Sequence, residues 1–295
     1  MERTEALGRV IGQGATSTVI LQPDGIVCKL FNPEFSREEI LREGRMAENA
    51  FRLGLRVPKP FGPIELEGRI GLRSEYLPGD ILAQILTREP ERYGELFPLY
   101  LRELQRFHET EGDVRDFVSA KDLYLEKISR LSDTGWYTPE ELQKMELLVR
   151  SVPDRNTLVY GDYHPKNIIV NNNELFFVDL GDLCLGHPLF DFAMIANTHF
   201  IIPSMNPAYA AKYFAAAPEQ MLRLWDELFA GYFTEMSPGR QNTVKKQIMA
   251  FAILRQGLSP ADSRTFPEKV LQGNVAVTKK KLLPEIDALI GSIDW

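Results

Sequence analysis

The hydrophobic pattern of this 295-residue chain changes near residue 77 from mainly strand-like to mainly helical spacing. Before that point, short apolar runs alternate with turn signals such as Pro23-Asp24-Gly25, a pattern typical of strands. After it, apolar residues mostly recur at helical spacing. We therefore predict an α+β chain with a strand-rich part at residues 1–77 and a mainly helical part at residues 78–295.

Local signals place the expected elements within each part. The first part is expected to hold five strands, at residues 7–12, 18–22, 26–31, 62–66 and 69–76, the last two joined by the turn Glu67-Gly68. A helix is expected at 36–53, because Ser36 and Glu39 form a capping box and Gly54 ends the helical pattern. The second part should contain helices at 81–88, 93–110, 123–131, from Thr138 onward and after Pro188, and short strands at 157–160, 168–170 and 175–180.

Composition and charge exclude several classes of protein. The formal net charge of −7 argues against a nucleic-acid partner, which would favour a basic surplus. Cys28 and Cys184 are far apart and are interpreted as ordinary reduced thiols. The longest apolar candidate, Phe190–Ile202, is interrupted by polar residues, and the first residues lack the apolar core of a secretory signal. A cytoplasmic protein without a membrane partner is therefore expected.

Two neighbouring motifs carry the chemistry. Tyr160-Gly161-Asp162-Tyr163-His164-Pro165-Lys166-Asn167 is followed, after a predicted hairpin, by Phe177-Val178-Asp179-Leu180-Gly181-Asp182. Phosphoryl transfer needs a carboxylate to accept the proton of the attacking hydroxyl, and an amide and a carboxylate to hold Mg²⁺ against the phosphates. The order and spacing of these residues predict that chemistry, whereas each piece alone is common.

These segments, together with the later Gly186-His187-Pro188 and Asp191-Phe192-Ala193, resemble the aminoglycoside phosphotransferase and choline kinase family. That family is a small-molecule branch of the protein-kinase-like fold, so the resemblance implies a two-lobed structure with ATP and Mg²⁺ as cofactors. It covers the chain to about residue 200 and then fades.

The resemblance assigns roles to particular residues. Asp162 is expected to be the catalytic base, and Asn167 and Asp179 the metal ligands. One departure is Tyr160, which stands where the family often has His and which we expect to tune activity as a structural support. His164 is expected either to neutralise the transferring phosphate or to be a hydrogen-bonded loop histidine.

The N-terminal part supplies matching nucleotide-binding signals. Residues 12–19 fit the glycine loop of kinases, with Gly12, Gly14 and Ser17 at the three glycine positions. The loss of the third glycine is expected to stiffen the loop. Lys29 follows at the position of the kinase strand lysine and is expected to contact the α- and β-phosphates.

A helical glutamate should pair with this lysine. We choose Glu43, because Ile40, Glu43, Ala47 and Phe51 share one helical face, whereas Glu39 is occupied by capping.

By the same resemblance, main-chain groups of Glu75 and Leu77 in the connection between the two parts are expected to bind adenine. Asp191, at the start of a later helix, should brace the catalytic loop, and Asp182 is expected to be an ordinary solvated acid.

Only eight residues, 182–189, separate Gly181 from the next expected helix start at Phe190. This leaves no room for the activation segment of a protein kinase, so the expected acceptor is a small hydroxyl compound. Aminoglycoside, choline, sugar and amino alcohol all stay open. A choline site would need an aromatic cage. The candidates are Trp136, Tyr137, Trp225 and Tyr232, which can also be interpreted as core residues.

Three other functions are alternatives to a small-molecule kinase. The first is a nucleotide-binding pseudokinase, which would lack at least one of the key residues. The other two are a protein kinase and a nonenzymatic scaffold.

Overall fold

The computed structural model describes residues 8–14, 16–66, 68–214, 216–262 and 266–295. The chain forms two compact units, one from residues 1–99 and 165–183 and the other from residues 100–164 and 184–295. Among the described residues, no helix combines the length and apolar character needed to cross a membrane.

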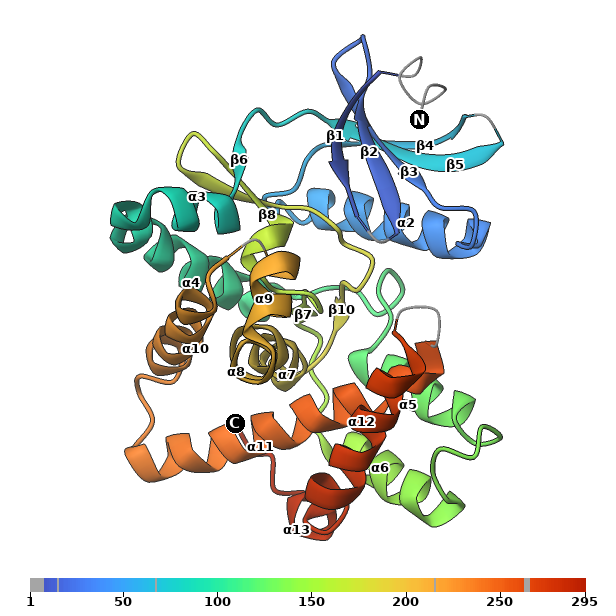
Figure 1. The fold of residues 1–295 in the computed structure, drawn as a ribbon, viewed down its shortest axis with the longest axis vertical. Coiled ribbons are helices and arrows are strands. Elements are labelled where there is room, and N and C mark those ends of the chain that lie inside the picture. Colours follow the sequence, from blue (N-terminus) through green and yellow to red (C-terminus); the bar gives the residue numbers. More distant parts are fainter. Residues whose placement is uncertain (1–7, 15, 67, 215, 263–265) are drawn as a thin grey trace. The chain divides into compact units, whose positions relative to one another are not determined.

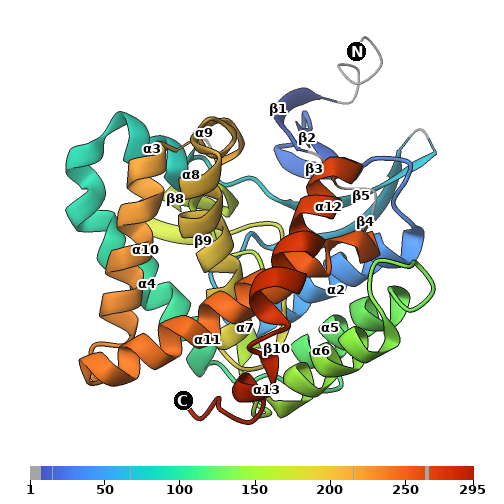
Figure 2. The same cartoon turned by 60° about the horizontal axis from the view of Figure 1, so that its bottom comes forward.

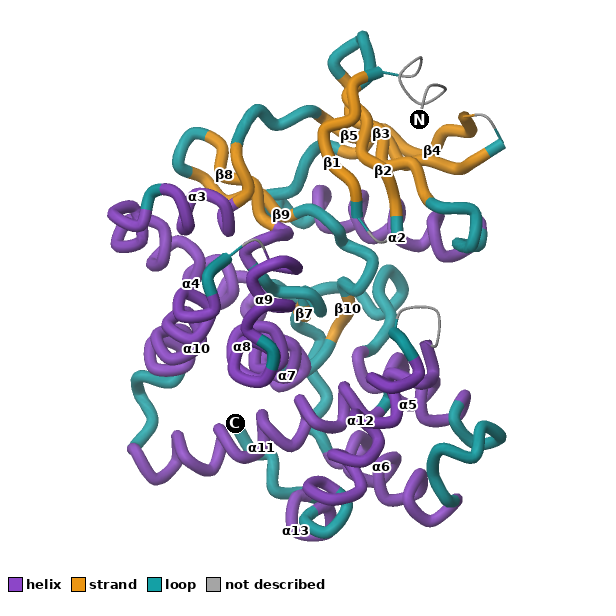
Figure 3. The backbone as a smooth tube through the Cα atoms, in the orientation of Figure 1, coloured by secondary structure: helices purple, strands orange, loops and turns teal. Residues whose placement is uncertain are grey.

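The first unit is built on a five-stranded antiparallel sheet in the order β1-β2-β3-β5-β4, accompanied by helix α2 (Figures 1 and 3). Its elements are β1 (Arg9–Gln13), β2 (Ser17–Leu21), β3 (Ile26–Phe31), α2 (Arg37–Arg52), β4 (Pro60–Leu66) and β5 (Arg69–Glu75). Helix α2 packs against β4 and β5. Ile20, Cys28 and Leu30 form the core of the sheet, with Ile64 and Leu66 packed against them.

Sequence signals placed most of these elements to within two residues. Ser36 and Glu39 form the expected capping box, and Gly54, at φ 73°, follows the end of α2 in the left-handed conformation that glycine favours. The turn at Pro23-Asp24-Gly25 closes through a hydrogen bond from the Gly25 N–H to the Gln22 carbonyl. Leu7, Ala15 and Glu67, which the sequence patterns included, lie outside the described residues.

The first unit also contains a smaller three-stranded sheet in the order β6-β8-β9. Its strands are β6 (Asp80–Ile81), β8 (Ile168–Asn171) and β9 (Glu174–Phe177). The same unit contains helix α3 (Leu82–Arg88) and the 3-10 turns η1 (Pro90–Arg92) and η2 (Pro165–Asn167). Asn172 and Asn173 adopt positive φ angles of 50° and 60°, as the asparagine turn between β8 and β9 requires. The last strand ends at Phe177, not at Leu180, so the residues of the second motif leave the ladder before Asp179.

The second unit is mainly helical, and in it α11 lies beside α7 and α12 (Figure 2). Helix α4 (Tyr93–Glu109) begins in the first unit and belongs to the second from residue 100 onward. The other helices and turns of the second unit are α5 (Ala120–Arg130), α6 (Pro139–Ser151), α7 (Leu189–Ile195), α8 (Ile202–Met205), α9 (Pro207–Phe214), α10 (Pro218–Tyr232), α11 (Pro238–Gly257), the 3-10 turn η4 (Ser259–Asp262), α12 (Glu268–Val277) and α13 (Ile286–Leu289). Two π-helical turns, Ala196–Ile201 and Thr278–Leu282, and the paired strands β7 (Leu158–Val159) and β10 (Cys184–Leu185) complete it. The buried residues Leu189, Phe192, Trp225 and Phe251 belong to its core.

Candidate active site

The hairpin of β1 and β2 carries the predicted glycine loop. Gly12 pairs with Val19, and the Gly14 N–H donates to the Ser17 carbonyl at 2.9 Å. A Cβ added to Gly12 or Gly14 would meet no described atom closer than 3.5 Å, and neither glycine has a positive φ. The described part of the chain therefore does not itself require glycine at these positions, whereas a ligand approaching the backbone would. Ser17 is 4% exposed and pairs with Phe31, which fixes this end of the loop to the sheet.

Lys29, in the middle of β3, joins two carboxylates. Its Nζ lies 2.6 Å from Glu43 Oε1 on α2 and 3.0 Å from Asp179 Oδ1. Burial disfavours the ammonium, but the charges of Asp179 and Glu43 outweigh this effect and raise the pKa of Lys29. Burial also raises the pKa of the Glu43 carboxyl, and the charge of Lys29 opposes this effect only in part. The lysine is therefore a fixed cation held between residues that are far apart in the sequence.

The buried side of helix α2 differs from the predicted one. Phe51, expected on the inward side, is 42% exposed, and the buried residues of α2 are Ile40, Met46, Asn49 and Ala50. The expectation for Phe51 is thus wrong, because the buried stripe is rotated around the helix toward Met46. Glu43 lies beside this stripe, with its side chain 14% exposed, where an unpaired carboxylate would be costly.

The hairpin of β8 and β9 brings Asn167 and Asp179 to the same end of the small sheet. The Val178 N–H donates to the Asn167 carbonyl at 3.0 Å, directly before Asp179. Asp179 has φ 62°, a left-handed conformation that few residues other than glycine adopt. The following Gly181 is fixed to α2, since Arg42 donates to its carbonyl at 3.0 Å. Asn167 is 8% exposed, and the Asp179 side chain is 47% exposed.

The segment after β5 contains the predicted adenine-binding residues. The Glu75 N–H donates to the Lys59 carbonyl at 2.8 Å and is therefore already used within the chain. The Glu75 carboxylate in turn accepts from the Lys59 N–H at 3.2 Å. Leu77 is 8% exposed. The Glu75 N–H is therefore not free to contact a base.

In the second unit, Asp162 lies beside His164, with Asp162 Oδ1 3.3 Å from His164 Nε2. The Asp162 side chain is 24% exposed, whereas His164 is 2% exposed and packs edge-on against Phe214, with ring centroids 5.4 Å apart. The Nδ1 atom of His164 is buried and finds no hydrogen-bond partner in the described residues. The burial of His164 beside Asp162 supports its interpretation as a loop histidine, one of the two roles that the sequence left open.

Asp191 holds the backbone immediately before Asp162. Its fully buried carboxylate accepts from the Tyr160 N–H at 2.8 Å, the Gly161 N–H at 2.7 Å and, across 3.0 Å, from His108 Nε2. Because a carboxylate can only accept, Nε2 of His108 is the donor, and in the neutral imidazole Nδ1 then accepts from the Tyr232 hydroxyl 2.8 Å away. Three N–H donors thus compensate one buried negative charge and fix the loop.

Comparison with known sequences decides the family of the chain. The sequence model described as the phosphotransferase enzyme family matches residues 8–226, which is more than half of the chain. The chain belongs to this phosphotransferase enzyme family. The prediction of a phosphotransferase is thereby confirmed. No curated protein sequence matches the chain.

Solved structures show the fold of this phosphotransferase. It is similar to the aminoglycoside phosphotransferase APH(2'')-Ib in its ADP-bound form, with 18% identity over 94% of this chain and 93% of that chain, at a TM-score of 0.60. The amicoumacin kinase hAmiN has 16% identity, coverage of 99% and 94%, and a TM-score of 0.58. A choline/ethanolamine kinase family protein from Mesorhizobium loti has 14% identity, coverage of 96% and 92%, and a TM-score of 0.56. The predicted protein-kinase-like fold is therefore confirmed.

Several contacts of this phosphotransferase escaped sequence reasoning. His108 on α4 and Tyr232 on α10 lie 83 and 124 residues from their respective partners, Asp191 and His108, so no local pattern links them. Arg42, one position before Glu43, was also missed as the residue that holds Gly181. An arginine beside the chosen glutamate is the signal that could have drawn attention to it.

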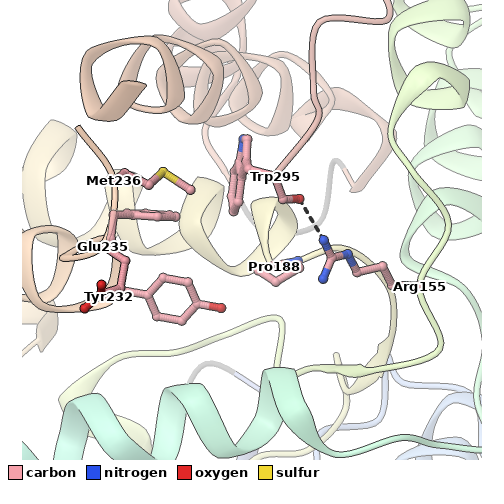
Figure 4. Close-up of a pocket in the computed structure, with 7 residues that line it drawn as sticks. Arg155, Pro188, Tyr232, Glu235, Met236 and Trp295 are labelled. Atoms are coloured by element: carbon pink, nitrogen blue, oxygen red, sulfur yellow. Dashed lines mark hydrogen bonds between the residues drawn. The ribbon is translucent and has the colours of Figure 1, made fainter. Parts of the chain in front are cut away.

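Three of the four aromatic residues considered for a choline cage in this phosphotransferase have other partners in the structure. Tyr137 and Trp225 are 4% and 0% exposed and belong to the core, and the hydroxyl of Tyr232 is held by His108. Tyr232 also lines a cavity of about 190 Å³ in the second unit (Figure 4). The other residues around this cavity are Arg155, Pro188, Phe233, Glu235, Met236 and Trp295, and Arg155 donates to the Trp295 carbonyl at 2.8 Å.

Proposed function

We propose that this phosphotransferase is an ATP- and Mg²⁺-dependent kinase that phosphorylates a hydroxyl group of a small molecule. The observation that carries the proposal is the contact of Lys29 with both Glu43 and Asp179 at 2.6 and 3.0 Å. An ion pair that fixes the lysine together with an acid of the metal-binding motif is the arrangement that phosphoryl transfer from a nucleotide requires. It joins three elements that the sequence patterns predicted separately.

Residues 1–77 are proposed as the nucleotide-binding lobe. In this assignment the backbone around Gly12 and Gly14 approaches the phosphates, Ser17 anchors the loop, and Lys29 neutralises the α- and β-phosphates. Adenine would contact main-chain groups of the segment from Glu75 to Leu77. The room beside both glycines supports this part of the proposal.

The residues present fit a magnesium ion. Asn167 and Asp179 offer amide and carboxylate oxygens, which are ligands that Mg²⁺ accepts, and their nearness follows from the hydrogen bond between Val178 and Asn167. A Mg²⁺ site that keeps several water molecules and binds substrate phosphates needs only one or two protein side chains. The bound ion would supply positive charge that stabilises the transferring phosphate.

Residues 78–295 are proposed to carry the base and the acceptor pocket. The acceptor hydroxyl oxygen would attack the γ-phosphorus while the bond from that phosphorus to the bridging oxygen of ADP breaks, and Asp162 would take the hydroxyl proton. His164 orients the Asp162 carboxylate, and Asp191 fixes the backbone amides on its N-terminal side. Similar structures include the gentamicin complex of APH(2'')-IIa, which supports a small-molecule acceptor.

The test is a screen for ATP consumption. The purified chain is incubated with MgATP and with hydroxyl compounds of different classes: kanamycin, choline, glucose and serinol. We expect ADP release that depends on one acceptor class and on Mg²⁺, together with a phosphorylated product found by mass spectrometry. Binding of ATP without transfer to any acceptor would instead favour the inactive, regulatory alternative.

A further inference from the structure

The last turn of helix α11 contacts the catalytic loop. Arg255, a partly buried residue of this turn, donates from Nη2 to the Gly161 carbonyl at 3.2 Å. Gly161 directly precedes the proposed base, Asp162, and is separated from Arg255 by 94 positions in the sequence. A cation at the C-terminal end of a helix is favourable in any case, because the helix dipole places negative charge there. That preference explains a positive residue in this turn, but it does not explain a hydrogen bond to a distant loop.

Two helices thereby hold the two sides of Gly161. Asp191 on α7 accepts from the Gly161 N–H at 2.7 Å, and Arg255 on α11 donates to the Gly161 carbonyl. The peptide group before Gly161 is therefore held by an anion, and the peptide group after it by a cation. The two helices pack against each other (Figure 2), and the rings of Phe190 and Phe251 meet edge-on with centroids 5.9 Å apart. Both contacts with the loop thus come from one packed pair of helices.

Gly161 needs such contacts because its own backbone is permissive. Its φ of 85° lies in the left-handed region, which glycine enters about as readily as the right-handed one. Rotation about the Cα–C bond of Gly161 turns the peptide group that joins it to Asp162, and this rotation redirects the Asp162 side chain. Asp191 does not oppose the rotation, because it binds the N–H on the other side of Gly161. The bond from Arg255 does oppose it, since this bond holds the carbonyl that would turn.

We propose that Arg255 is a positioning residue for phosphate transfer, which fixes the peptide group before Asp162 and so keeps the carboxylate directed at the acceptor hydroxyl. This inference rests on the proposed kinase function and adds to it a residue that acts through the base. Loss of Arg255 should therefore lower kcat without weakening the binding of MgATP or of the acceptor. A residue that touched the acceptor itself would instead change the acceptor KM.

The experiment compares the wild type with Arg255→Met, Arg255→Lys and the control Arg240→Met. Methionine keeps an unbranched side chain but cannot donate, whereas lysine keeps a charged donor. Arg240 lies in the first turn of the same helix, and its guanidinium contacts the Asp294 carboxylate. We measure kcat and the KM values for MgATP and for the acceptor found in the screen. Hydrogen exchange of a peptide that spans residues 158–164 is followed by mass spectrometry, so that the loop is also observed without turnover.

We expect kcat to fall about 10- to 100-fold in Arg255→Met, the factor that corresponds to a lost hydrogen bond from a charged donor. Both KM values should stay unchanged, and amide exchange in residues 158–164 should become faster. Arg255→Lys should show the same changes at a smaller size, and it carries the test if Arg255→Met does not fold. The control should match the wild type in every measurement.

The opposite results separate this inference from the function on which it rests. A wild-type kcat in both Arg255 variants, or a higher acceptor KM at unchanged kcat, would overturn the positioning role and leave the kinase function in place. Unchanged exchange of the loop peptide together with a lower kcat would also overturn it, because the loop would then be held without Arg255. Absence of transfer by the wild type to every hydroxyl compound would overturn the kinase function and, with it, this role.

Discussion

Replacing Lys29 by methionine tests whether its two carboxylate contacts form a functional unit. The substitution keeps most of the side-chain volume but removes the cation that lies 2.6 Å from Glu43. Because the Lys29 and Glu43 side chains are only 17% and 14% exposed, loss of one partner leaves a largely buried, uncompensated carboxylate. Breaking such a pair costs about 3 kcal/mol of unfolding free energy. Asp179 adds little to this cost, because its side chain is 47% exposed and can be solvated.

A second substitution separates stability from function. In the double variant Lys29→Met/Glu43→Leu no charge remains buried, so most of the lost unfolding free energy should return. The affinity for MgATP should nevertheless stay low in both variants, because the phosphates have lost their cation. Urea unfolding at pH 7 measures the first quantity, and titration with MgATP measures the second.

An exposed ion pair provides the matched control. Arg223 and Glu227 on α10 are also 2.6 Å apart, but their side chains are 57% and 37% exposed. Arg223→Met should therefore change the unfolding free energy by less than about 1 kcal/mol. If Lys29→Met were as mild as this control, or if Glu43→Leu restored nothing, the interpretation of a buried functional pair would be refuted.

Three further predictions concern other groups of the chain. Burial lowers the pKa of His199 to about 3, so the folded state excludes a proton that the unfolded state takes up below pH 6.5. Between pH 7 and pH 5 this group should cost about 2 kcal/mol of stability, and His199→Asn should reduce that loss in urea unfolding; an unchanged pH dependence would contradict the assignment. Asn167→Ala should raise the Mg²⁺ concentration at half-maximal rate several-fold, and a shift in the KM for the acceptor alone would argue against a metal role. Tyr232→Phe removes the hydroxyl that donates to His108, which should cost about 1–3 kcal/mol of stability and lower kcat without changing the affinity for MgATP. A kcat equal to that of the wild type would show that the Tyr232 hydroxyl does not help to hold the loop.

Sequence reasoning succeeded where the physical signal is local. The capping box of Ser36 with Glu39 and that of Thr138 with Glu141 depend on neighbours three residues apart, and both are present. The asparagine turn of residues 171–173 is equally local, because asparagine tolerates the left-handed backbone that this turn needs.

The sequence did not predict features that depend on packing between distant elements. Phe51 follows the helical spacing of α2 but is exposed, because the sheet covers a neighbouring stripe of the helix. His108 and Tyr232 fit the helical patterns of α4 and α10, and only the folded chain brings them to Asp191. The two π-helical turns, Ala196–Ile201 and Thr278–Leu282, insert a residue that a period of 3.6 does not predict.

The most direct test of the kinase mechanism is the substitution Asp162→Asn, which keeps the shape of the side chain and removes its basic carboxylate. We predict that the variant binds MgATP with the affinity of the wild type, since the proposed nucleotide contacts lie on other residues. Its kcat for the acceptor found in the screen should fall by a factor of about 1,000, as expected when a general base is lost. Transfer at the rate of the wild type would show that Asp162 is not the base and would contradict the proposed mechanism.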